Sequence, residues 1–386
     1  MIKIIDKKNC CGCTACASIC AHEAISMLPD SLGFLYPVVD ASKCINCGLC
    51  ENVCSFNDHY DISANFSIPK AFAVRHKDLS EIMKSRSGAS FPAISDWVFN
   101  QGGVVYGVGY KDHFVVAHKK ATNLKERDEF RGSKYVQSDL RGVYAQVKKD
   151  LKGGYLVLFS GTPCQTAGLA SFLGNKFREK LILVDIVCHG VPAPYIWRDY
   201  IDYLEQKHHS QVINVDFRNK KKFGWRDHRD SIYFANGEED DSSWYSTEFC
   251  KHLHFRPSCG VCHFCNLKRP SDFTLGDFWG LEYQNAEFNS DNKGASLLLI
   301  NTPKGLHLFQ KINDKLNFFE TSPDIYTKLN PNLRKPLWVH PKSDKFAQDY
   351  TKKGFSYIFS HDYDKVSFLH LCFRKVKVYL KRLIDR

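Results

Sequence analysis

Two runs of four cysteines lie at the start of this 386-residue chain and constrain it more than any other feature. The first run is Cys10, Cys13, Cys16 and Cys20, spaced C-x2-C-x2-C-x3-C, and the second repeats that spacing with Cys44, Cys47, Cys50 and Cys54. Bacterial two-cluster ferredoxins hold [4Fe–4S] clusters with this run, and the fourth cysteine of each run ligates the other cluster. The spacing therefore predicts one cluster on Cys10, Cys13, Cys16 and Cys54 and another on Cys44, Cys47, Cys50 and Cys20.

Two other uses of cysteine fit this spacing less well. Zinc sites take four ligands in two pairs rather than two runs of four. Disulfide frameworks belong to short secreted chains, and we expect no signal peptide ahead of these cysteines. Ala21 and Ser55 replace the proline that usually follows the fourth cysteine, and Cys11 is a surplus thiol. These departures weaken the match but remove no ligand.

Composition places the rest of the chain among globular proteins of a reducing compartment. Apolar residues make up 44% and charged residues 25%, and no stretch approaches the ~20 apolar residues that span a bilayer. Sixteen cysteines favour metal ligation and a cytoplasmic location. The net charge of +11 suits nucleic acid, an anionic membrane surface, or anionic substrates and acidic partners. No nucleic-acid-binding motif is present, so we expect no nucleic-acid partner.

From Lys70 onward, short apolar stretches alternate with helical ones. Strands are predicted over 71–75, 102–110, 155–159 and 181–187, helices over 91–100, 140–151, 165–173 and 195–206, and shorter strands over 212–218, 231–235 and 297–300. This alternation predicts an α/β domain with a mostly parallel sheet, preceded by a small α+β two-cluster ferredoxin-like domain. We expect the ferredoxin-like domain over 1–57, a linker over 58–69, the α/β domain over 70–360 and a C-terminal helix over 361–386.

A second cysteine group follows the shorter strands. Cys259, Cys262 and Cys265 are spaced C-x2-C-x2-C, without a fourth cysteine close behind. Cys164 and Cys188 come at the ends of predicted strands, where the loops of α/β folds converge, and they would complete a site with Cys259 and Cys262. By spacing alone, a structural zinc site remains open, and a lone cysteine is usually a small buried apolar residue.

Several stretches of the core match a known family in order. They are SRSGAS (85–90), GSKYVQS (132–138), GTPCQTAGL (161–169), VDIVCHGVP (184–192), FRNKKKFGW (217–225), RPSCGVC (256–262) and SDFTLGDFWG (271–280). Together they resemble the coenzyme F420 hydrogenase/dehydrogenase β-subunit family. The resemblance implies FAD and a third [4Fe–4S] cluster, whose shared cysteines match Cys164, Cys188, Cys259 and Cys262. Cys265 matches no shared position and stays as an alternate ligand.

The small-residue loop before the helix over 91–100 is the predicted seat of the flavin pyrophosphate. Ser87, Gly88 and Ser90 precede the helix, whose N-terminus offers free N–H groups and the positive end of its dipole. A plain strand–helix turn with a serine cap is the alternative. Ala89 stands where the family commonly has a second glycine. Further flavin contacts are expected from Lys134, Tyr135, Ser138, Thr162 and Gln165.

Two functions fit these motifs. The first is an oxidoreductase that moves electrons between ferredoxin-type clusters and FAD and reduces or oxidises an organic substrate. Coenzyme F420 and, from bacterial relatives in cell-surface glycan pathways, a sugar-linked metabolite are candidates. The second is a non-catalytic electron-transfer subunit that feeds a partner enzyme. Partners are accordingly a ferredoxin, a dehydrogenase or hydrogenase subunit, or a small molecule.

Other polar groups near these motifs have open roles. Five basic residues around Trp225 could bind an anionic substrate or an acidic donor protein, or form a solvated loop: Lys220, Lys221, Lys222, Arg226 and Arg229. His189 and Asp277 could deliver a proton to a substrate, although structural hydrogen bonding is the more common use of such residues. No residue is assigned a catalytic role.

The C-terminus carries an apolar stripe at helical spacing with basic residues on the other faces. Leu369, Cys372, Phe373, Val376, Leu380 and Leu383 form the stripe. Such a helix is typical of peripheral attachment in a membrane interface, here at the inner face of a cytoplasmic membrane. A terminal helix packed on the α/β domain by the same stripe is the alternative.

Overall fold

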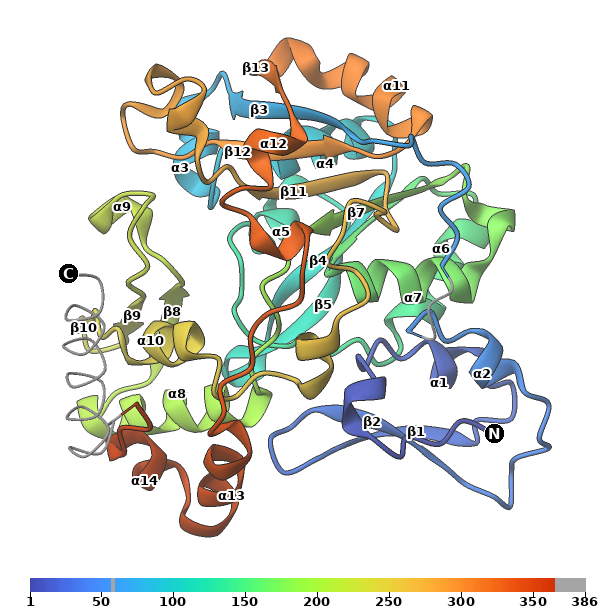
Figure 1. Ribbon diagram of the computed structural model, residues 1–386, viewed down its shortest axis with the longest axis vertical. Coiled ribbons are helices and arrows are strands. Elements are labelled where there is room, and N and C mark those ends of the chain that lie inside the picture. Colours follow the sequence, from blue (N-terminus) through green and yellow to red (C-terminus); the bar gives the residue numbers. More distant parts are fainter. Residues whose placement is uncertain (57–59, 365–386) are drawn as a thin grey trace, which may run out of the picture. The chain divides into compact units, whose positions relative to one another are not determined.

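The computed structural model describes residues 1–56 and 60–364, and the chain divides into two compact units, Met1–His340 and Pro341–Arg386 (Figure 1). The first unit contains every predicted site residue. It is built from a small N-terminal hairpin segment, a large mixed sheet with helices on both faces, and a small antiparallel sheet.

The N-terminal segment has the α+β form that the cysteine runs predict. Strands β1 (Ile25–Pro29) and β2 (Leu35–Val39) form an antiparallel hairpin. The short helices α1 (Ala15–Ile19) and α2 (Leu49–Asn52) each follow a loop that bears cysteines, so that α1 carries Cys16 and α2 carries Cys50.

The large sheet has eight strands in the order β13-β3-β12-β11-β7-β6-β4-β5. The four neighbours β11, β7, β6 and β4 are parallel, and β3 runs in the same direction, whereas β5, β12 and β13 run antiparallel to it. The bounds are β3 (Lys70–His76), β4 (Val104–Lys111), β5 (Val115–Ala121), β6 (Val157–Gly161), β7 (Leu181–Ile186), β11 (Phe273–Asp277), β12 (Ser296–Ile300) and β13 (Leu316–Thr321). The predicted α/β fold class is confirmed.

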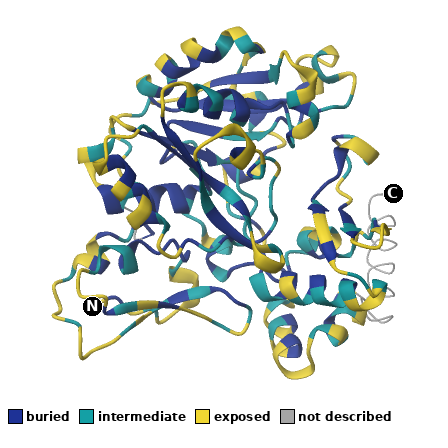
Figure 2. Ribbon diagram, turned by 180° about the vertical axis from the view of Figure 1, so that it is seen from behind, coloured by how far each residue is buried: buried dark blue, intermediate teal, exposed yellow. Residues whose placement is uncertain are grey.

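Helices cover both faces of this sheet, which is why its central strands β6 and β7 are mostly apolar. Leu158 and Ile182 point to the face covered by α4 (Ser90–Asn100) and α11 (Pro303–Ile312). Phe159 and Leu183, one residue further along, pack on the other side with α6 (Val143–Lys152) and α7 (Pro163–Leu173). The N-terminal segment joins this second core, and Figure 2 shows the sheet as the most buried part of the molecule.

The small sheet has the order β10-β9-β8 and is antiparallel. Its strands are β8 (Val212–Asp216), β9 (Ser231–Phe234) and β10 (Glu239–Asp240), accompanied by α8 (Pro194–His208), α9 (Lys220–Phe223) and α10 (Trp244–Lys251). Other short helices are α3 (Leu79–Lys84), α5 (Leu124–Asp128) and α12 (Pro323–Tyr326).

The segment that we expect to be a linker has no helix or strand at residues 60–69 before β3, yet it is held in place. The hydroxyl of Tyr60 donates to the Lys268 carbonyl at 2.6 Å, and the Asn65 amide donates to the Arg269 carbonyl at 2.7 Å. The path from the cysteine-rich segment to the large sheet therefore runs beside the third cysteine group.

The second unit contains α13 (Ser343–Lys353) and α14 (Phe355–Ser360), neither of which the sequence patterns had indicated. Residues 365–386 of the predicted C-terminal helix lie outside the described residues, so peripheral membrane contact stays a prediction. Across the described ranges, no helix has the length and apolar character needed to cross a membrane.

Candidate functional site

A cavity of about 570 Å³ lies at the carboxyl ends of β6, β7 and β11. Open α/β sheets bind ligands at this edge of their parallel strands. Seven of the eight residues predicted to contact flavin line it: Ser87, Ser90, Lys134, Tyr135, Ser138, Thr162 and Gln165. The eighth, Gly88, has a packing role, because a Cβ there would lie 2.1 Å from the Val74 carbonyl oxygen and 2.7 Å from the Ser296 nitrogen.

The N-terminus of α4 enters this cavity. Ala89 precedes the helix in the left-handed conformation, with φ 66° and ψ 36°, which is the backbone that a glycine adopts without cost. The sequence therefore places a strained alanine at the point where the helix begins, next to Ser90.

Buried donor groups without a protein partner converge on the cavity wall. Among the described residues that line the cavity, five have such a group: Ser85 Oγ, Ser90 Oγ, Arg86 Nε, Arg131 Nη1 and Arg218 Nε. Buried polar atoms are nearly always paired, so unpaired donors indicate a ligand that accepts hydrogen bonds. Three guanidinium groups and a helix N-terminus suit the phosphates of a dinucleotide. These residues fit FAD.

The stretch that holds Lys134 and Tyr135 is mostly engaged with the protein itself. The Lys134 ammonium donates to the carbonyl oxygens of Glu129 and Arg131, the latter at 3.1 Å, and its burial lowers its pKa to about 7. The Tyr135 hydroxyl accepts a hydrogen bond from Arg218 Nη1 at 3.2 Å. Lys134 thus orders the loop after α5 through these carbonyl contacts.

Ser138, Thr162 and Gln165 form one buried network. The Gln165 amide donates to Ser138 Oγ at 3.0 Å, and its oxygen accepts from the Thr162 N–H at 2.9 Å. The second bond closes the capping box that starts α7. Thr162 Oγ1 also lies 3.2 Å from Cys164 Sγ. This network therefore joins the cavity wall to a predicted cluster ligand.

Two buried carboxylates of the cavity differ in their partners. Asp277 accepts from Arg218 at 2.5 Å and from Trp225 Nε1 at 3.3 Å. Although burial acts to raise its pKa, the guanidinium charges of Arg218 and Arg86 hold the pKa below the ordinary value. Asp230 has no ion-pair partner among the described residues; it accepts from the Arg218 N–H and from Ser246 Oγ. Burial raises the pKa of Asp230 to about 7.

Imidazole and indole rings complete the wall. His189 Nε2 lies 2.6 Å from His252 Nε2, and burial lowers the pKa of His189 to about 4. Trp279 stacks on Trp225 with 4.6 Å between ring centroids, and His228 stacks on Trp279 at 5.8 Å. These flat surfaces are able to receive a ring system.

The five basic residues around Trp225 do not act as one patch. Lys220 is buried and donates to the carbonyl oxygens of Ser87 and Lys293, so it supports the loop before α4. Lys222 pairs with Glu239 and Asp241. Arg226 pairs with Glu282 at 3.6 Å and Arg229 with Asp227 at 3.2 Å, whereas Lys221 is exposed.

The first predicted cluster site is a buried thiol group beside a buried cation. The thiols of Cys13, Cys10 and Cys54 all act on Cys16, whose pKa is raised chiefly by burial. Arg256 Nη2 lies 3.6 Å from Cys10 Sγ, and Arg256 is 1% exposed. A buried cation next to thiols is what a thiolate-ligated, anionic cluster requires, so these residues fit it.

The second predicted site is more exposed. Cys47 is exposed, and Ile45 (63% exposed) and Leu49 (48%) flank it. Backbone N–H groups of Ile2 and Ala24 donate to the sulfurs of Cys50 and Cys20, at 3.3 and 3.4 Å. Hydrogen bonds to sulfur are among the features by which a protein sets a cluster's potential, so this site also fits its cluster.

The third group gathers cysteines from three separate segments. Cys188 is buried among thiols of Cys259, Cys164 and Cys262, and burial chiefly raises its pKa. It also lines the cavity and accepts from the Gly190 N–H at 3.4 Å. The Cys265 thiol interacts with Cys262 and lowers the pKa of Cys262 to about 7, so Cys265 remains an alternate ligand.

Helix α7 brings the first and third groups close together. Cys164 and Gly168 lie one turn apart on its surface, and a Cβ on Gly168 would be 2.8 Å from Cys13 Sγ. Cys11, the surplus thiol, interacts with both Cys13 and Cys164, and these contacts raise its pKa. The first group therefore adjoins the third through α7, and the third group reaches the cavity at Cys188.

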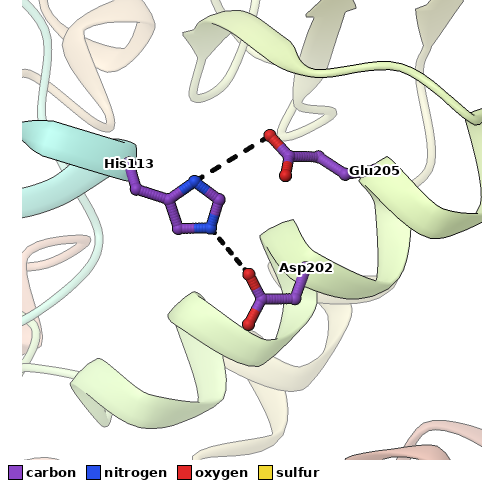
Figure 3. Close-up of side chains that lie close together, drawn as sticks. All are labelled: His113, Asp202 and Glu205. Carbon is purple, nitrogen blue, oxygen red and sulfur yellow. Dashed lines mark hydrogen bonds and ion pairs between the residues drawn. The ribbon is translucent and has the colours of Figure 1, made fainter.

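A further cluster of potential metal ligands lies on the surface. Ligand atoms of His113, Asp202 and Glu205 are within 4.8 Å of one another (Figure 3). His113 Nε2 is 2.6 Å from Asp202 and Nδ1 is 3.9 Å from Glu205, so the two ring nitrogens face different carboxylates. One ion cannot bind both nitrogens of a ring, and the arrangement is an ion-pair bridge to α8.

Comparison with known proteins identifies two families along the chain. Residues 155–324 match the family described as the C terminus of the coenzyme F420 hydrogenase/dehydrogenase beta subunit, and residues 9–57 match the 4Fe-4S dicluster domain. The resemblance to this family is thereby confirmed, and the chain is an iron–sulfur redox protein related to the β subunits of these hydrogenases and dehydrogenases.

Other comparisons add little. No curated protein matches the chain. Twelve chains of solved structures match it, among them a chain of the F420-reducing [NiFe] hydrogenase complex from Methanosarcina barkeri, solved with xenon derivatization. That chain is 15% identical, with 75% of this chain and 90% of that chain covered and a TM-score of 0.46.

Sequence patterns missed the residues that give the cavity its charge. Arg86, Arg131, Arg218 and Asp230 line the cavity, and Arg256 lies beside the first cysteine group. Arg86 and Arg218 lie inside the matched stretches SRSGAS and FRNKKKFGW, and this position was the only feature of the sequence that could have indicated a role in binding. Their convergence depends on the sheet topology, which spacing in sequence does not reveal.

Proposed function

We propose that this protein is an iron–sulfur flavin-dependent oxidoreductase that passes electrons between ferredoxin-type [4Fe–4S] clusters and FAD and so reduces or oxidises an organic substrate. The observation that supports it most is the set of five buried, unpartnered donors around a cavity of about 570 Å³ whose wall includes Cys188. FAD bound in this cavity would lie next to the third cysteine group.

The cysteines divide into three ligand sets. Cys10, Cys13, Cys16 and Cys54 would hold the first cluster, Cys44, Cys47, Cys50 and Cys20 the second, and Cys164, Cys188, Cys259 and Cys262 the third. The exposed Cys47 marks the end at which electrons are exchanged with another protein. The half-buried Cys188 marks the end next to the cavity.

When bound, FAD would convert between the single electrons of the clusters and the two-electron chemistry of an organic molecule. The chain's own residues would bind and orient it. The N-terminus of α4, Ser90 and the guanidinium groups of Arg86 and Arg131 would hold the pyrophosphate. The stacked rings of Trp279 and His228 offer a flat wall to an aromatic ring.

Two substrate candidates are supported by the family resemblance and by the charge of the cavity wall. Coenzyme F420 is one candidate because the matching family is named for it, and a glycan-pathway metabolite is another. The guanidinium groups of the wall would favour a candidate that carries an anionic group. Fold alone does not settle the choice between them.

The proposed function is tested most directly by asking whether the protein contains and binds FAD. Protein purified without oxygen should release FAD on heating, identified by chromatography, and the apoprotein should bind added FAD. Ser90→Ala should weaken that binding about fivefold, because a hydrogen bond contributes roughly 1 kcal/mol.

Ser95→Ala is the matched control, since Ser95 is buried in the same helix but its hydroxyl donates to the Pro92 carbonyl. It should leave the affinity for FAD unchanged. A protein that contains no flavin and binds none on addition would contradict the proposed oxidoreductase function.

A second function is an electron-transfer subunit that feeds a partner enzyme. The family name specifies a β subunit, and the exposed apolar residues Ile45 and Leu49 beside Cys47 suit contact with a redox partner. Purified protein that turns over a small molecule with a reduced dye favours the first function. Protein that contains all its cofactors but reduces only another protein favours the second.

A further inference from the structure

Arg256 is a buried arginine that reaches from the third cysteine group into the first. It stands three residues before Cys259 and is 1% exposed. Its backbone N–H donates to the Val191 carbonyl at 3.0 Å, close to Cys188, and its own carbonyl accepts from the Cys259 N–H at 2.9 Å. The main chain of Arg256 therefore belongs to the loop of the third group.

The side chain of Arg256 belongs to the first group. Its Nε donates to the Cys10 carbonyl at 2.8 Å, and Nη2 lies 2.9 Å from the Leu35 carbonyl and 3.6 Å from Cys10 Sγ. A Cβ on Gly12 would be 2.7 Å from Nη1, so the loop between Cys10 and Cys13 is shaped around this guanidinium.

Gln137 and two aromatic rings complete the surroundings. Gln137 accepts from Arg256 Nη1 at 2.8 Å and donates to the Cys11 carbonyl at 3.0 Å, so it clamps the same loop. The guanidinium lies over Tyr36 and Phe34, at 4.4 and 5.5 Å from their ring centroids.

The charge of Arg256 has no conventional counter-ion. Among the described residues no carboxylate pairs with it, and its polar neighbours are carbonyl oxygens, an amide oxygen and the sulfur of Cys10. Arg127 and Arg269, which are as deeply buried, pair with Asp96 and Asp185. A buried unpaired cation is costly, so the missing negative charge is best supplied by thiolates next to it.

We propose that Arg256 is a positioning residue that raises the reduction potential of the cluster held by Cys10 and fixes the loops of the first and third cysteine groups against each other. The proposal rests on the clusters of the proposed function. A positive charge and a hydrogen bond at a ligating sulfur both stabilise the reduced, more negative cluster, and these are the levers by which proteins set such potentials.

The test is a redox titration of the full-length protein, reconstituted without oxygen and followed by electron paramagnetic resonance. Arg256→Gln should lower the midpoint potential of one component clearly and leave at least one other unchanged, because Arg256 touches no ligand of the second cluster. Arg256→Lys keeps the charge and should recover most of the potential. Arg127→Gln, a buried arginine paired with a carboxylate, is the matched control and should shift no component.

Two results would overturn the proposal. One is Arg256→Gln with full iron content and all potentials as in the natural protein. The other is loss of iron by both Arg256→Gln and Arg256→Lys, which would assign Arg256 to folding alone. Iron and sulfide assays of the unsubstituted protein test the clusters themselves, so failure of the proposed function is distinguished from failure of this inference.

Discussion

The N-terminal cysteine segment and the cavity are two sites of opposite construction. The segment takes its predicted ligands from two continuous runs, each inside a loop that leads into a short helix, α1 or α2. The cavity draws on loops after β6, β7 and β11, on the N-terminus of α4 and on the edge of the small sheet.

Because of this difference, we expect amino-acid substitutions to affect the two sites in different ways. In the runs, the order of the ligands is set by local spacing, although Arg256 and Gln137 from the rest of the fold hold the loop between Cys10 and Cys13. In the cavity, the polar groups depend on how the strands pack, so a substitution that disturbs the packing disturbs the site. The predictions below test this contrast, from the largest expected effect to the smallest.

The largest effect should come from removing a ligand of the third group. The full protein should hold about twelve iron after reconstitution, four for each of three clusters. Cys259→Ala should lower this to about eight, because the two runs keep their own ligands. Iron and acid-labile sulfide assays measure the change.

Cys250→Ala is the control, because Cys250 is exposed and belongs to none of the three ligand sets. It should keep all the iron. About eight iron together with one zinc in the natural protein would overturn the third cluster and leave the N-terminal pair intact.

The next effect concerns packing beneath the cavity. Gly88→Ala places a Cβ 2.1 Å from the Val74 carbonyl oxygen, a backbone atom of β3 that cannot move aside. Overpacking of this kind should destabilise the first unit by about 3 kcal/mol. Urea unfolding followed by fluorescence gives the free energy of unfolding.

Gly102→Ala is the control for Gly88→Ala, because it replaces a glycine where the new Cβ would meet no other atom. Gly102 has φ +69° with nothing within 4 Å of a Cβ, so only backbone strain of about 1 kcal/mol applies. Equal effects of the two substitutions would show that strand packing does not constrain the loop before α4.

The contrast also explains what sequence could predict. The two runs, the α/β class and most central strands followed from spacing and alternation, because these signals are local. Cys164 and Cys188 were placed near Cys259 by their position at the ends of predicted strands, and the family resemblance matched the same four cysteines to a third cluster. The contact of Cys188 with Cys164 and Cys259 depends on strands β6 and β7 lying side by side. Strand β5 was missed because its polar residues His118 and Lys119 interrupt an apolar run, although His118 is buried against Phe159.

The arginines of the cavity were beyond sequence reasoning for a physical reason. A charged residue in a loop is usually solvated, so its sequence position alone does not indicate a binding role. The side chains of Arg131 and Arg218 indicate such a role only because the structure shows that they are buried. Arg256 is similar, since nothing in its local sequence shows that it reaches Cys10, 246 positions away.

Asp230 predicts a pH dependence of stability that arises at the cavity. Its pKa is raised to about 7 by burial, with Asp216 nearby acting in the same direction. Between about pH 4 and pH 7 the unfolded chain loses this proton while the folded protein keeps it, so stability falls as the pH rises. Asp230→Asn should remove this slope.

The expected result is an Asp230→Asn variant of the flavin-free protein that is more stable than the natural protein at pH 8, by roughly 2 kcal/mol, and no more stable at pH 4. Urea titrations at the two pH values decide it. Asp277→Asn should behave in the opposite way, because the pKa of Asp277 is lowered by Arg218. A parallel pH dependence of the two variants would rule out the assigned difference between these carboxyls.

The smallest effect should come from Ala89, which stands where the resemblance in SRSGAS leads us to expect a glycine. Ala89 has φ 66° and lines the cavity. Ala89→Gly relieves the left-handed strain but adds freedom to the unfolded chain, so the net gain in stability should be about 0.5 kcal/mol. The FAD dissociation constant should fall slightly, because the backbone can approach the ligand more closely. Measurements of unfolding and of FAD binding on the same preparation test both, and weaker binding by the glycine variant would mean that the methyl group itself contacts the flavin.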